Sequence, residues 1–243
     1  MAIKWYGLAG ALPFALAATS AHSAEPLVLN PSTDWVLDFA EERCSLVRGF
    51  GEGDDAVRFQ IDSFGQNYNY RVLVAGKPIS IGNGPTGELR YRLTSDSELR
   101  PKIDTLEGRS GEAAALAFHT AFGPHVSAET MEGLSAEKRL TWGSEYRDRL
   151  PAFHETVAAI DLHLRGNNVV RLELGPMGPA LKALETCIAD LQAHWGLNPE
   201  QQRQLIRPPV PKEATIRRLQ RQYPADLALE GVNASVPVRL LVD

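Results

Sequence analysis

Hydrophobic and polar residues alternate along several stretches between residues 43 and 174. The alternating apolar positions are Val57, Phe59 and Ile61; Tyr68, Tyr70, Val72 and Val74; Leu89, Tyr91 and Leu93; Ile160, Leu162 and Leu164; and Val170, Leu172 and Leu174. A period of two that is rich in β-branched and aromatic residues predicts half-buried β-strands. Glycine- and asparagine-containing breaks separate these stretches, so the pattern predicts a meander of antiparallel hairpins, most clearly over residues 157–174.

The pattern changes to a helical period after Gly175 and Pro176. Apolar residues then recur at steps of three and four, at Met177, Leu181, Leu184, Ile188, Leu191 and Trp195. This spacing predicts an amphipathic helix that packs on the sheet and ends at Gly196. Residues 127–150 are polar and fit a short helix or an excursion loop. The predicted fold class is therefore α+β, with an antiparallel β-rich domain over residues 25–196 and a packed C-terminal helix.

A proline-containing basic linker is predicted over residues 197–222, with a short basic helix from Glu213 to Gln222. The basic residues from Pro199 to Gln222 are Arg203, Arg207, Lys212, Arg217, Arg218 and Arg221. They stand out because the whole chain of 243 residues carries a net charge of −5. Such a linker can make weak contact with anionic lipid or with an acidic protein face, whereas so few charges do not indicate nucleic-acid binding.

One further strand is predicted near the C-terminus, where Val236, Val238, Leu240 and Val242 alternate with their neighbours. A lone strand leaves backbone donors and acceptors unpaired, so it needs a neighbouring strand. Either residues 25–196 supply that neighbour, or the natural polypeptide continues beyond Asp243.

The N-terminal residues 1–24 have the pattern of a signal peptide: Lys4, an apolar stretch to Ala18, and then small polar residues. Cleavage after Ser23 or after Ala24 fits the sequence, and an uncleaved N-terminal anchor is the alternative. Export places Cys44 and Cys187 in an oxidising compartment. We therefore predict a Cys44–Cys187 disulfide, against the alternative of two separate buried thiols.

No catalytic motif is apparent in the sequence. His119, His125, His154 and His163 lack the i, i+4 spacing with an intervening glutamate that helical zinc sites use. The glycine cluster of residues 49–53 precedes a strand rather than the helix that a phosphate-binding loop requires. The sequence therefore predicts a protein that is not an enzyme, with no cofactor and no metal.

The C-terminal residues resemble the opening of the C-terminal domain of TonB-type energy transducers. The matching positions are Tyr223, Pro224, Ala228, Gly231, Val236, Val238, Arg239, Val242 and Asp243. The resemblance implies that residues 223–243 begin an incomplete TonB-like β unit, and that the protein works in the periplasm.

Proteins of that family add a strand of an outer-membrane transporter to their sheet and transmit energy to it. The resemblance thus implies a binding and coupling protein, with a TonB-dependent transporter as partner and the strand at Val236, Val238, Leu240 and Val242 as the partner-binding element. The alternative is an exported enzyme or a stand-alone envelope protein with an unrecognised site.

Overall fold

The computed structural model describes residues 25–65, 68, 70–79, 86–94, 96, 98–127, 132–133, 135–165, 168–203, 214, 217–218 and 221. The strands are β1 (Leu27–Leu29), β2 (Val36–Ala40), β3 (Arg43–Phe50), β4 (Val57–Ser63), β5 (Tyr70–Gly76), β6 (Thr86–Leu93), β7 (Ile103–Ser110), β8 (Ala113–Thr120), β9 (Ile160–His163) and β10 (Val169–Leu172). The helices are α2 (Ala136–His154), α3 (Met177–His194) and α4 (Pro199–Arg203), and a short 3-10 turn spans Gly53–Asp55.

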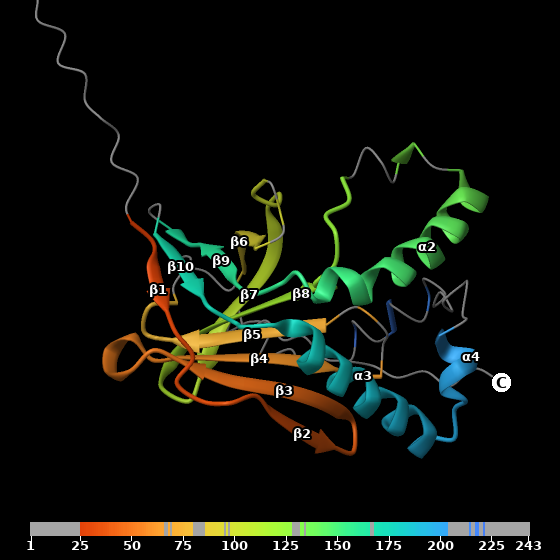
Figure 1. The fold of residues 1–243 in the computed structure, drawn as a ribbon, viewed down its shortest axis with the longest axis horizontal. Coiled ribbons are helices and arrows are strands. Elements are labelled where there is room, and N and C mark those ends of the chain that lie inside the picture. The colour runs from red at the N-terminus through yellow and green to blue at the C-terminus, as the bar shows by residue number, and fades with distance from the viewer. Residues whose placement is uncertain are drawn as a thin grey trace, which may run out of the picture.

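Within the described residues the strands form a ten-stranded sheet in the order β1-β10-β9-β6-β7-β8-β5-β4-β3-β2 (Figure 1). Every neighbouring pair is antiparallel except β1 and β10, which run parallel. The sheet closes on itself, because the residues that follow β1 form backbone hydrogen bonds with the end of β3. Gly51 N–H donates to the Asn30 carbonyl and Ser32 N–H to the Gly49 carbonyl, each at 2.9 Å. The sheet is thus a barrel joined through residues 30–32.

The core lies inside this barrel, where alternate residues of each strand point inward. The aromatic residues Phe50, Phe59, Tyr70 and Phe122 are fully buried and contact one another mostly edge to face. A T-shaped aromatic contact adds about 0.5–1.5 kcal/mol to the burial of its area. The predicted alternation at Val57, Phe59 and Ile61, and likewise at Val72 and Val74, therefore marks the inward-facing side.

Helix α3 covers the end of the barrel near the β2–β3 and β4–β5 turns (Figure 1). Its predicted stripe is buried at Met177, Leu181, Leu184, Ile188 and Leu191. The helix ends as expected at Gly196, whose φ of +77° is a left-handed conformation that glycine adopts without steric cost. The prediction of this helix and of the α+β class is confirmed.

Three details of the predicted architecture need correction. The meander is wrong beyond β5, because β5 pairs with β8, while β6 pairs with β7 and β9. Residues 136–154 form a 19-residue helix, longer than the short helix or loop expected there. Strands β1, β2, β7 and β8 were not predicted. The predicted hairpin of residues 157–174 is confirmed, since β9 and β10 are antiparallel neighbours.

Several predictions fall wholly or in large part outside the described residues: the signal peptide, more than half of the basic linker with its short helix, and the TonB-like unit of residues 223–243. The described start of the linker forms α4. Across the part of the chain that the structure describes, no helix combines the length and the apolar character that a membrane crossing requires.

Candidate functional site

Strand β2 is the open edge of the sheet. The chain enters this region as β1, which pairs with β10. The residues after β1 form hydrogen bonds with the end of β3. The chain then continues as β2, which in the described part of the chain pairs with β3 alone. Strand β10 ends at Leu172, opposite Leu29. The chain then turns at Gly175, with φ +70°, and enters α3 instead of extending beside β2. Among the described residues, no strand therefore lies beside the outer border of β2.

The hairpin geometry shows which backbone groups this border presents. A two-residue turn, Glu41-Glu42, joins β2 to β3, and Ala40 lies opposite Arg43. In such a hairpin the flanking residues form a hydrogen-bonded pair, and bonded and non-bonded pairs then alternate along the strands. Leu37, opposite Leu46, and Phe39, opposite Cys44, thus direct their N–H and C=O groups away from β3. These groups can bind an added strand.

The side chains of β2 make this edge partly apolar. Phe39 is 64% exposed and Val36 is 59% exposed, and the exposed Asp38 lies between them in sequence. Residues directly opposite on paired strands share a face, so Phe39 lies on the inner face with Cys44, and Asp38 on the outer face with Ser45. An added strand would accordingly meet Leu37 and Phe39 on the inner face, and Val36 beside the Asp38 carboxylate on the outer face.

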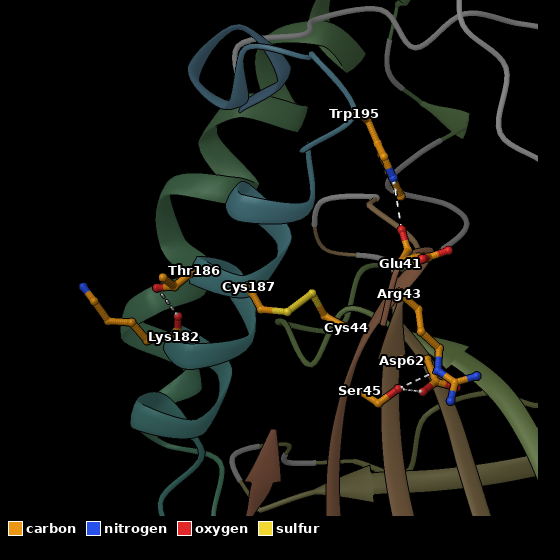
Figure 2. The surroundings of a disulfide bond; sticks show 9 residues. All are labelled: Glu41, Arg43, Cys44, Ser45, Asp62, Lys182, Thr186, Cys187 and Trp195. Carbon is orange, nitrogen blue, oxygen red and sulfur yellow. Dashed lines mark hydrogen bonds between the residues drawn. A yellow bond between two sulfur atoms is a disulfide. The ribbon is translucent and has the colours of Figure 1, made fainter. Parts of the chain in front are cut away.

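The Cys44–Cys187 disulfide joins β3, the strand beside β2, to helix α3, as Figure 2 shows. The bridge joins residues 143 positions apart, with a Cα–Cα distance of 6.1 Å. Beside it, the Trp195 indole N–H donates to the Glu41 carbonyl at 3.2 Å, directly at the β2–β3 turn. The Gln192 amide donates to the Gly65 carbonyl at 2.8 Å in the next turn. The predicted disulfide is therefore present, and it holds one end of β3 in place.

Two buried aspartates organise the outer face of the barrel. Asp62 accepts hydrogen bonds from Arg71, Ser45 and Gln60, at distances from 2.7 to 3.1 Å. Asp161 is held between Arg92 and Arg171, whose guanidinium groups lie at 2.8 and 2.6 Å on the two neighbouring strands. Because each carboxylate accepts several charge-assisted bonds, these clusters fix strand pairing. They do not offer a free acid or base.

A third aspartate, Asp96, forms an ion pair with Arg100 that is almost wholly buried, with a distance of 2.7 Å between Asp96 Oδ2 and Arg100 Nε. Arg100 also donates to the Tyr91 hydroxyl at 3.3 Å and to the Gly123 carbonyl at 2.6 Å. Asp96 accepts a further bond from the Leu93 N–H. The Arg100 guanidinium thus links the residues after β6 to the residues after β8 by hydrogen bonds and stabilises their position.

Three of the four histidines considered as ligands lie on different elements. His119 lies on β8 and His163 on β9, whereas His154 is buried at the end of α2. Burial is the first cause that lowers the pKa of each of these three imidazoles. Across the described residues, no group of three or more His, Cys, Asp and Glu side chains is arranged to hold a metal ion.

The sequence predictions thus meet the structure unevenly. Cys44 and Cys187 come together as predicted. The candidate partner-binding residues Val236, Val238, Leu240 and Val242 lie outside the described residues. The edge at β2 was missed; the apolar residues Trp35, Leu37 and Phe39 at every second position could have indicated a strand, but not that it lies at an edge.

Comparisons of this chain with protein-family models, with curated proteins and with solved structures found no match in any of the three.

Proposed function

We propose that this chain is a periplasmic binding and coupling protein of the TonB-like class. In this proposal residues 25–203 form a rigid body, and residues 223–243, which we call the C-terminal segment, carry the strand that contacts an outer-membrane transporter. The basic residues of the linker add weak attraction to anionic lipid headgroups. The proposal is one of binding, not of catalysis.

The observation that supports this proposal is the disulfide-linked body, taken together with the strand that the sequence predicts beyond a proline-containing linker. Disulfides persist in oxidising compartments such as the periplasm, and Cys44 and Cys187 are paired here. The prolines at 208, 209 and 211 favour a locally extended connector between the body and the C-terminal segment. Strand addition then supplies affinity through backbone hydrogen bonds.

The test is site-specific photo-crosslinking in intact cells. A photoreactive phenylalanine analogue at Arg239, inside the predicted strand, should capture an outer-membrane TonB-dependent transporter. The matched control places the same analogue at Lys182, which is exposed on the side of α3 away from the disulfide (Figure 2). Equal capture from both positions, or a transporter adduct from neither, would contradict the proposed function.

A second measurement tests the mode of contact. A peptide that copies the extended periplasmic segment of the captured transporter should bind the purified mature chain. Two versions of this peptide, N-methylated at alternate sets of residues, each lack the backbone donors of one of the peptide's two borders. Removing donors on the paired border should weaken binding strongly, while removing those on the other border should leave it nearly unchanged. Equal loss from both peptides would argue against strand addition.

A further inference from the structure

We infer that, when no partner is bound, the open edge of β2 pairs with the strand Val236–Val242 of the same chain. The inference rests on the part of the proposed function that makes residues 236–242 a strand. It names the neighbour of that strand in the isolated protein and gives the edge at β2 a specific occupant.

The route of the chain leaves the C-terminal segment within reach of this edge. The indole of Trp195, at the end of α3, bonds to Glu41 in the β2–β3 turn, and α4 follows four residues later. About 30 residues then separate Arg203 from Val236, which as a flexible coil span about 30 Å on average. A tether of this kind gives an effective concentration in the millimolar range. Even weak strand pairing would therefore be populated.

Pro237 decides which border of the strand faces the sheet. Proline has no N–H, so the border formed by residues 237, 239 and 241 lacks one donor, as in strands at the edge of a sheet. The opposite border, formed by Val236, Val238, Leu240 and Val242, keeps all of its backbone groups. We therefore place this complete border against β2 and the border with Pro237 toward solvent.

The side chains agree with this placement. On β2, the residues whose backbone groups point outward are Leu37 and Phe39, and their side chains lie on the inner face. Opposite residues share a face, so the apolar set at 236, 238, 240 and 242 would cover the exposed Phe39. On the other face, Arg239 would come beside Asp38, whose carboxylate is 56% exposed and lies 4.0 Å from its nearest cation, Arg43. Backbone polarity, hydrophobicity and charge thus favour the same pairing.

This pairing has a consequence for partner capture. A strand that rests on β2 offers a partner only the fraction of molecules in which it is released, so the apparent affinity falls by that fraction. Weakening the contact with β2 should therefore strengthen partner binding.

The test compares two adjacent leucines in the full mature chain. Leu240→Pro removes a donor from the border that faces β2, whereas Leu241→Pro, the matched control, removes one from the solvent border. Hydrogen exchange resolved by residue should show Leu37 and Phe39 amides about tenfold or more slower in the wild type and in Leu241→Pro than in Leu240→Pro. The Asp38 amide, which faces β3, should remain equally protected in all three proteins.

Exchange of Leu37 and Phe39 that is as fast in the wild type as in Leu240→Pro overturns the inference. Protection that disappears on dilution, with a dimer mass by light scattering, overturns it in favour of a second copy of the chain. Neither measurement involves a transporter. If the analogue at Arg239 captures no transporter while the Leu37 and Phe39 amides are protected, the proposed function fails and the inference stands. If the analogue captures a transporter while these amides exchange fast, the inference fails and the proposed function stands.

Discussion

Strands β1 and β2 belong to one short run of chain, yet their surroundings differ. Leu29 in β1 lies between β10 and the end of β3 and is 4% exposed, whereas Phe39 in β2 lies on the open edge. Both are large apolar residues on the inner face of the sheet. The difference arises because β10 ends opposite Leu29 and the chain leaves at Gly175 to form α3. Both segments form strands, but the point at which β10 ends determines which of the two strands has neighbours on both sides.

The largest expected effect concerns the disulfide that joins β3, the strand beside β2, to helix α3. Replacing both cysteines by alanine removes a cross-link between residues 143 positions apart. The chain-entropy estimate is a loss of about 4–5 kcal/mol in the free energy of unfolding, or a fall in Tm on the order of 10–15 °C. Calorimetry would check this.

The same variant should sharpen the comparison between the two strands. Amide exchange should increase more over residues 36–47, next to the lost bridge, than over residues 27–32, which β10 and the end of β3 still hold. A uniform increase would show that the bridge stabilises the whole barrel and not the open edge in particular.

A pair of alanine substitutions tests the comparison directly. Leu29→Ala should lower the free energy of unfolding by about 2–5 kcal/mol, because it leaves a cavity in the core. Phe39→Ala, made in the Leu240→Pro background where the edge is free, should change it by no more than about 0.5 kcal/mol. Urea unfolding would measure both. Similar losses at the two positions would mean that Phe39 packs against the body.

The smallest expected effect is a pH dependence on the closed side of the barrel. Burial lowers the pKa of His163 in β9; Asp161 opposes this, while Arg92 and Arg90 lower the pKa further. The unfolded chain, with an ordinary imidazole pKa near 6.5, therefore binds more protons below that pH than the folded protein does. Stability contributed by the neutral imidazole is present above about pH 6.5 and is lost as the pH falls toward 5.

His163→Gln should flatten this pH dependence without abolishing it, because the pKa values of His119 and His154 shift in the same direction. Urea unfolding between pH 7.5 and 5 would measure the slope. Amide exchange should show the acid-induced loosening in β9 and β10 and not in β2. A variant that keeps the full wild-type slope would exclude His163 as a contributor.

The sequence predicts those elements whose own residues carry a strong period. Strands β4, β5, β6, β9 and β10 and helix α3 have clear apolar alternation or a clear apolar stripe, and each was found. Strand β8, AAALAFHT, is rich in alanine, which has low β-propensity, and its place depends on pairing with β5. Helix α2 contains Gly143 and Pro151 and has little amphipathic character, so tertiary contacts such as those of the buried Leu150 support it.

The candidate site divides in the same way. An even cysteine count and the predicted export were sufficient to predict the disulfide. The open edge was not predictable from local pattern, because it depends on where β10 stops and on the bonds of residues 30–32, and these are long-range facts.

The disulfide also determines how the molecule would respond to a pull on its two ends. Tension entering through the C-terminal segment can unwind α4 and the last turns of α3, but it reaches Cys187 and passes through covalent sulfur to Cys44. The chain between the two cysteines is bypassed, which keeps roughly 500 Å of contour length from being extended. Most of the barrel strands lie inside that bypassed loop, so mechanical load would leave them folded until the bridge is reduced.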